Sequence, residues 1–191
     1  MDSTPNGLEL TGKILIAMPG MGDPQFAHSV VYLCAHSNDG AMGLIVNKTM
    51  GKMKFADLLD QLSIQQAIHS RKMPLYFGGP VEGGRGFVLH SSEYTSQIST
   101  LRVDDDFAMT ATLDVIEEMA EGAGPDKALL ALGYSGWGPG QLEEEIGQNG
   151  WLICDAGLEL VFDLQDDKKW EAALNSLGID ALTLSASSGR A

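Results

Sequence analysis

Positively charged residues are scarce in this chain. Its 191 residues include 12 Lys and Arg against 26 Asp and Glu, which gives a net charge of −14 at pH 7. A surface this acidic repels the phosphates of nucleic acids and of anionic lipids, whose partners normally carry a basic patch. The composition therefore argues against direct binding to nucleic acid or to a membrane surface.

Cysteines are few, and long apolar runs are missing. No stretch approaches the roughly 18 apolar residues of a membrane-spanning helix, and the first residues lack the basic and apolar segments of a signal peptide. Cys34 and Cys154 both lie inside apolar stretches, as buried free thiols do in proteins of a reducing compartment. These features predict a cytoplasmic protein.

What the chain does contain is the composition of an ordinary globular protein, with 44% apolar and 20% charged residues. Its length fits one domain. No repeat, low-complexity block or linker divides the sequence. We therefore predict a single domain over residues 1–191, with loosely ordered tails at residues 1–11 and 185–191.

The first part of the chain has the pattern of β-strands. Short apolar runs rich in β-branched residues occupy positions 12–19, 29–36 and 41–48, and the spacer at 37–40, Ser-Asn-Asp-Gly, has the composition of a hairpin turn. Because the runs at 29–36 and 41–48 do not alternate with polar residues, we expect both faces of the sheet to be covered.

Helical patterns appear farther along the chain. Apolar spacing predicts a helix within residues 53–64 and another within 112–122, the latter with Leu113, Ile116 and Met119 on one face. Further helices are expected near 139–148 and 166–178, and strands at 127–134, 151–155 and on both sides of a glycine-rich loop within 74–91. Together these elements predict a mixed α/β (α+β) fold.

The segment LALGYSGWGPGQLEEEI, residues 130–146, has the strand, turn and helix of a nucleophile elbow or a phosphate-binding loop. Trp137 stands where the elbow motif has its second glycine, and all four histidines precede Ser135. For a phosphate, Pro139 lacks a donor and the glutamates at 143–145 are repulsive. We therefore interpret the segment as a structural turn with a small residue at Ser135.

A second glycine-rich segment, residues 78–86, contains Arg85. A guanidinium can bind a phosphate or carboxylate through two N–H groups. No helix follows this segment, so a flexible turn with a solvated Arg85 is the simpler interpretation.

The remaining polar residues do not have the spacing of a cofactor site. His28, His36, His90 and Asp23 show none of the short-range patterns of metal ligands. We therefore expect no metal and no other cofactor.

Three stretches taken together resemble one family: GKILIAMPGMGDPQFAHSVVYLCAHSNDGAMGLIVNK (12–48), LYFGGPVEGGRGFVLHS (75–91) and the segment 130–146. They are similar to the AlgH/YqgE family of bacterial cytosolic proteins, over nearly the whole chain. The resemblance implies a partly barrel-like mixed β-sheet flanked by helices and no established catalytic activity. It also implies an indirect part in transcriptional regulation.

The family commonly has Ala where this chain has Ser135, which implies that the hydroxyl is dispensable. The candidate ligand-binding residues are polar or aromatic residues within the family motifs: Asp23, His36, Asn47, Arg85, His90, Tyr134, Trp137 and Gln141. We expect several of them to share one glycine-shaped polar cleft near the ends of the sheet. Turn capping is the alternative role for Asp23 and Asn47, and packing for Trp137.

The sequence contains no complete catalytic set. We therefore predict a non-enzymatic binding or regulatory protein that recognises a small ligand or a protein partner. The alternative is a hydrolase or phosphate-handling enzyme in which His36 or His90 acts as the base.

Overall fold

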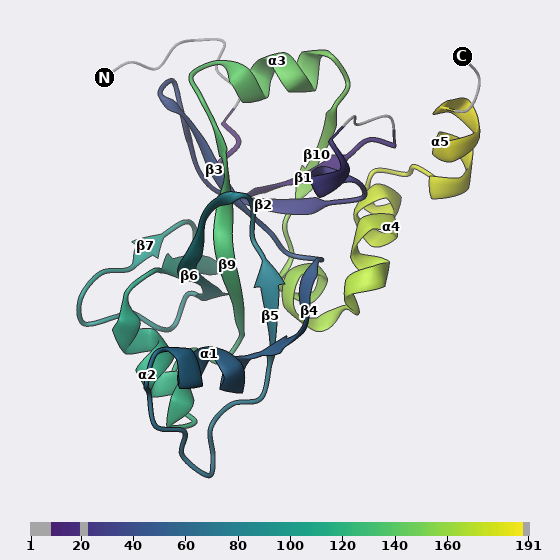
Figure 1. The fold of residues 1–191 in the computed structure, drawn as a ribbon. Helices are drawn as coiled ribbons and strands as arrows, with labels where there is room; N and C mark the ends of the chain where they lie inside the picture. Colours follow the sequence, from purple (N-terminus) through teal and green to yellow (C-terminus); the bar gives the residue numbers. More distant parts are fainter. Residues whose placement is uncertain (1–8, 20–22, 189–191) are drawn as a thin grey trace.

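A curled ten-stranded β-sheet forms the body of the protein (Figure 1). This computed structural model describes residues 9–19 and 23–188. The strands follow the order β10-β1-β2-β3-β9-β6-β8-β7, and β5, with β4 beyond it, also pairs with β9. Because β5 and β9 are parallel while the other pairs are antiparallel, the sheet is mixed, as predicted.

The strands are β1 (Lys13–Ala17), β2 (Val30–Ser37), β3 (Gly40–Ile45), β4 (Thr49–Lys54), β5 (Pro74–Phe77), β6 (Val81–Ser91), β7 (Leu101–Arg102), β8 (Phe107–Thr110), β9 (Ala128–Trp137) and β10 (Trp151–Asp155). The helices are η1 (Pro24–Phe26), α1 (Phe55–Gln61), α2 (Leu113–Ala120), α3 (Gln141–Gly147), η2 (Glu159–Asp163), α4 (Asp166–Ser176) and α5 (Ala181–Ser188). None of the helices in the described part of the chain is long and apolar enough to cross a membrane.

The predicted hairpin between β2 and β3 is confirmed. Ser37 pairs with Gly40, so Asn38 and Asp39 form a two-residue turn. Gly40 has a φ of +133°, and a Cβ there would lie 2.3 Å from the carbonyl oxygen of Trp137. Glycine is required at this position because the hairpin packs its backbone directly against β9.

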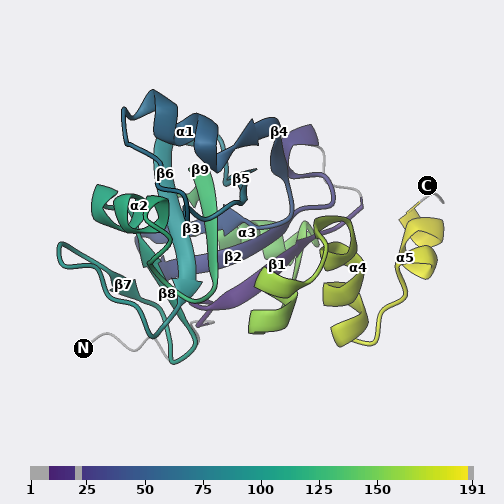
Figure 2. The same ribbon diagram turned by 90° about the horizontal axis from the view of Figure 1, so that it is seen from below.

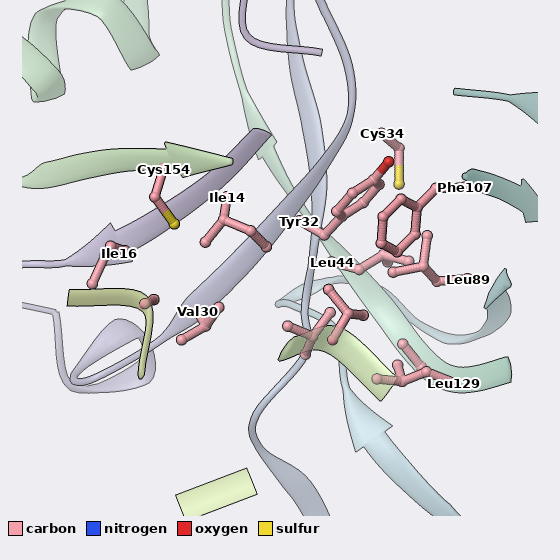
Figure 3. Close-up of a cluster of buried hydrophobic side chains, with 14 of the residues drawn as sticks. Ile14, Ile16, Val30, Tyr32, Cys34, Leu44, Leu89, Phe107, Leu129 and Cys154 are labelled. Atoms are coloured by element: carbon pink, nitrogen blue, oxygen red, sulfur yellow. The ribbon is translucent and has the colours of Figure 1, made fainter. Parts of the chain in front are cut away.

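The largest apolar cluster gathers side chains from strands across the sheet, from Ile14 of β1 to Phe107 of β8 (Figure 3). Tyr32 and Phe107 face each other there, with ring centroids 4.7 Å apart. Trp170 of α4 closes the cluster and donates its indole N–H to the carbonyl of Ala17 at 2.9 Å. Both cysteines are buried and unpaired, and burial raises the pKa of the Cys34 thiol to about 12.

Helices surround the sheet on the remaining sides. Leu142 of α3 packs with Trp137 and Trp151 against the opposite face of β1, β2 and β3. A third cluster lies between β5, β6 and β9 and the helices α1 and α2, which sit at the other end of the molecule from α4 and α5 (Figure 2). The expectation that both faces of the first strands are covered is therefore confirmed.

Two strands differ from the prediction. β9 continues to Trp137, so Ser135 lies within a strand, opposite Gly43 of β3, and the turn begins only at Gly138. β6 begins at Val81 and includes glycines that were assigned to a loop. Both strands extend because a neighbouring strand offers backbone partners where the local sequence alone favours a turn.

Three other places in the chain show details that the sequence does not give. Leu10, in the expected N-terminal tail, is only 2% exposed, because it packs with Trp137, Leu142 and Trp151, which belong to what we call the α3 cluster. Of the three apolar residues predicted to share one face of α2, Ile116 and Met119 are buried, whereas Leu113, the first residue of the helix, is 47% exposed. Residues 185–188 of the expected C-terminal tail belong to α5, and residues 1–8 and 189–191 lie outside the described residues.

A buried lysine links α4 to the sheet. The Nζ of Lys169 donates to the carbonyl of Val46 at 2.7 Å and lies 2.9 Å from Asp166 Oδ1, and its side chain is 1% exposed. The Tyr76 hydroxyl donates to the same carboxylate at 2.8 Å. Burial lowers the pKa of Lys169, and Asp166 offsets this only in part. This network satisfies a backbone carbonyl that α4 would otherwise cover.

We predict that Lys169→Met lowers the free energy of unfolding by about 3 kcal/mol, the scale for removing one partner of a buried ion pair. Lys168→Met, at the exposed neighbouring position, should change it by less than about 0.5 kcal/mol. Urea denaturation of both variants measures the difference. Equal midpoints for the two variants would contradict the structural role of Lys169.

Candidate ligand-binding site

An open groove of about 740 Å³ is lined by residues of five strands. It is lined by the β2–β3 hairpin between Ala35 and Met42, the first half of β6, the end of β8 and the last residues of β9. We call it the hairpin groove. It brings together four of the sequence candidates: His36, Arg85, Tyr134 and Trp137.

One wall of the hairpin groove is apolar. Phe87 of β6 and Tyr134 of β9 pack edge to face, with ring centroids 5.6 Å apart. Met42 and Met109 extend this wall. Gly136 packs closely against this wall, since a Cβ there would lie 3.3 Å from the Tyr134 ring. The wall can therefore accept a flat apolar group.

Arg85 supplies the positive charge at this wall. Its guanidinium lies over the Phe87 ring, 5.1 Å from the centroid. Glu82, also a groove residue, is 3.5 Å away in an ion pair whose side chains are both about half exposed (53% and 52%). Exposed pairs of this kind contribute little to stability. Arg85 is therefore held by the aromatic ring more than by its carboxylate partner.

His36 is fixed at the hairpin end of the groove. Its Nε2 lies 2.5 Å from Glu143 Oε1 on α3, and its side chain is only 7% exposed. Burial alone would raise the pKa of Glu143, but hydrogen bonds from its own backbone N–H and from His36 outweigh this and lower it. The pair thus ties α3 to the hairpin.

Three residues of the segment 130–146 are structural. Trp137 packs against Trp151 in the α3 cluster, with ring centroids 5.9 Å apart, and little of its side chain is exposed to the groove. Gln141 Oε1 accepts the N–H of Gly138 at 3.0 Å. Ser135 is buried and donates to the carbonyl of Gly78 at 3.1 Å. Of this segment, only Tyr134 contributes its side chain to the apolar wall of the groove.

Asp23 and Asn47 lie elsewhere and have the capping roles considered as the alternative. Asp23 accepts the N–H of Gln25 at the start of η1. Asn47 accepts the N–H of Val30 at 2.9 Å and donates to the carbonyl of His28 at 2.8 Å. Asn47 also lines a separate cavity of about 430 Å³ beside α4 and α5.

His90 is enclosed in the protein interior. Its Nδ1 must donate to the carbonyl of Ser91 at 2.8 Å, so its Nε2 accepts the hydroxyl proton of Thr110 at 2.8 Å. Thr110 in turn lies 2.8 Å from the hydroxyl of Thr100. Burial lowers the pKa of His90 and outweighs the raising effects of Ser91 and Glu93. The ring is a neutral link in a structural network.

Sequence reasoning missed the apolar residues of the groove. Arg85 and Phe87 are two positions apart, which places both on one face of a strand, and this spacing was the available signal. Met42 and Met109 carried no such signal, because their meeting depends on how the sheet curls. Among the described residues, no group of three or more His, Cys, Asp or Glu side chains is arranged to hold a metal ion.

The fold and groove define a single-domain α/β protein with a curled half-barrel sheet and a ligand-sized groove lined by five of its strands. The profile of the AlgH-like family matches residues 14–182. The chain therefore belongs to the AlgH-like family.

Relatives and solved structures agree with this assignment. The UPF0301 protein of Ruegeria pomeroyi is 58% identical over 96% of this chain and 100% of its own, and that of Paracoccus denitrificans is 54% identical over 100% of both. The solution structure of AlgH from Pseudomonas aeruginosa matches 97% of each chain, at 41% identity and a TM-score of 0.79. A crystal structure of a Corynebacterium diphtheriae protein shares the fold, with a TM-score of 0.69, at 20% identity over 88% of this chain and 87% of its own.

We predict that His90 makes stability depend on pH. Its pKa is lowered from 6.5 in the folded state, so the unfolded chain binds more protons at mildly acidic pH. The contribution of His90 to the free energy of unfolding is fully present above pH 6.5. It is lost as the pH falls toward the folded-state pKa, by up to about 1.4 kcal/mol per pH unit. Urea denaturation between about pH 7.5 and about pH 5 measures this slope.

His90→Gln keeps a donor and an acceptor but does not titrate, so its slope should be shallower than that of the wild type. His69→Gln, at an exposed position, should keep the wild-type slope. A wild-type slope in the His90 variant would exclude this residue as the source.

Proposed function

We propose that this protein is a non-enzymatic binding protein, and that the hairpin groove takes up its ligand or part of a protein partner. The observation that carries the proposal is the groove itself: about 740 Å³, an aromatic and methionine wall, and one arginine beside that wall. Pockets of about 300–1,000 Å³ with mostly apolar walls and a few polar groups are typical of small-molecule sites.

The contacts of the two histidines favour binding over catalysis. A general base needs a free acceptor nitrogen within reach of a substrate proton. Only 7% of the His36 side chain is exposed, which limits substrate access to its ring, and His90 Nε2 accepts from Thr110 within the interior. Ser135, the other residue considered as a nucleophile, is buried and donates to Gly78. These contacts give the hydrolase alternative no support.

A regulatory role would be indirect. The net charge of −14 opposes direct contact with DNA, so the protein would act through what it binds. Cytoplasmic localisation fits this role, because the buried thiols of Cys34 and Cys154 are unpaired.

We predict that a neutral fluorescent apolar probe, N-phenyl-naphthylamine, binds in the hairpin groove and that Gly136→Val weakens its binding about tenfold. A side chain at position 136 would push against the Tyr134 ring and fill the space beside it. Loss of roughly 60 Å² of apolar contact corresponds to about that factor. Fluorescence titration of the purified protein measures it.

Gly157→Val is the matched control, because a Cβ at Gly157 meets nothing within 4 Å. It should bind the probe like the wild type. The same variants extend the test to natural ligands: any metabolite or extract protein that binds the wild type should bind Gly157→Val and fail to bind Gly136→Val. Equal binding by both variants would refute the groove as the site.

A further inference from the structure

Arg85 lines two neighbouring cavities. Besides the hairpin groove, it lines a smaller cavity of about 220 Å³ between β6 and the helices α1 and α2. Leu62, Leu113 and Ile116 form the apolar part of this second cavity, and Ala111, like Arg85, lines both. The guanidinium group therefore sits at the junction of two apolar surfaces, where a single bound molecule could contact both.

The contacts of Arg85 leave its donors available. Its recorded partners in the described part of the chain are the Phe87 ring and Glu82, at 3.5 Å. Arg71 differs, because its guanidinium donates to the backbone carbonyls of Pro125 and Asp126. Arg85 is thus placed to form charge-assisted hydrogen bonds with a bound anion, and its contact with the Phe87 ring keeps the guanidinium at the groove.

The shape of the segment that carries Arg85 supports this role. Between Val81, which pairs with Tyr134, and Gly86, which pairs with Leu132, the register of β6 against β9 shifts. Glu82 has a φ of +48°, a conformation uncommon for a residue with a side chain. Such local strain tends to occur at ligand-binding segments. The shift places Glu82 and Arg85 together at the groove, where an incoming anion would replace a weakly held carboxylate.

We infer that the ligand of the hairpin groove is a small amphipathic anion, whose acidic group pairs with Arg85 and whose apolar body packs against Phe87 and Tyr134. This inference rests on the proposed binding function and names the class of ligand. The overall charge of −14 opposes any anion, but at physiological salt charges act over about 8 Å. Within the groove the charges that matter are therefore Arg85, its competitor Glu82 and, on the hairpin, Asp39.

The test compares two probes that share one apolar skeleton. Anilinonaphthalene sulfonate carries a negative group, whereas N-phenyl-naphthylamine is neutral. Arg85→Gln should weaken binding of the sulfonate about tenfold, which corresponds to about 1.4 kcal/mol, and leave binding of the neutral probe unchanged. Glu82→Gln should strengthen binding of the sulfonate severalfold, because it frees the guanidinium, and again leave the neutral probe unchanged.

Two further variants serve as controls. Arg85→Lys keeps the positive charge and should retain most of the affinity for the sulfonate. Arg102→Gln removes an arginine that lines neither cavity and is paired with Asp105 at 3.7 Å, so both probes should bind it like the wild type. Because the Arg85 and Glu82 side chains are about half exposed, these variants should fold, and thermal unfolding verifies this.

The outcomes separate the two proposals. If both probes bind but Arg85→Gln affects them equally or not at all, the anionic ligand class is wrong while the binding groove stands. If neither probe binds the wild type, the groove and the inference fail together. Opposite effects of Arg85→Gln and Glu82→Gln on the sulfonate alone would establish the inference.

Discussion

The close approach of backbones around β9 is the constraint on which the structure depends. β9 pairs with β3, β5 and β6, and the segment that joins β5 to β6 crosses close to its second half at two glycines. A Cβ at Gly79 would lie 2.2 Å from the backbone of Tyr134, and one at Gly78 would lie 2.2 Å from the carbonyl oxygen of Gly133. These distances are far below van der Waals contact, so the glycines are fixed by packing and need no catalytic explanation.

The groove is a result of this packing. The β2–β3 hairpin is held against β9 at Gly40. The first part of β6 also approaches β9 closely, since a Cβ on Gly133 would lie 3.2 Å from the Cα of Gly83. These two approaches bring the hairpin and the strand that carries Arg85 to the same end of β9. The backbone geometry thus places the apolar wall and the arginine together, although they come from segments far apart in the chain.

Much of the fold could be predicted from local sequence. The continuous apolar runs of β2 and β3 predicted covered faces, and the turn at Asn38 and Asp39 predicted the hairpin. The extent of β9 could not be predicted, since Gly133 and Ser135 have turn-forming character and are held extended only by the strands beside them. Lys169 was missed for a similar reason. Its burial depends on Val46 and Tyr76, which are distant in sequence.

The candidate site residues likewise fall into two groups, those that meet in the groove and those that stabilise the fold. His36, Arg85 and Tyr134 were chosen for their chemistry and meet in the groove, while Asp23, Asn47 and His90 have hydrogen bonds that satisfy them within the fold. A polar residue in a glycine-rich motif is ambiguous until its partners are known. Sequence could name residues capable of binding, but the curvature of the sheet decides which of them share a surface.

The buried thiol of Cys34 can be used to detect opening of the sheet. Cys34 is 1% exposed inside the curled sheet, and its pKa is raised to about 12, so its thiolate is scarce and shielded in the folded state. A thiol reagent reaches it only when β2 separates from its neighbours. The rate at which Cys34 is modified therefore reports how often the half-barrel opens.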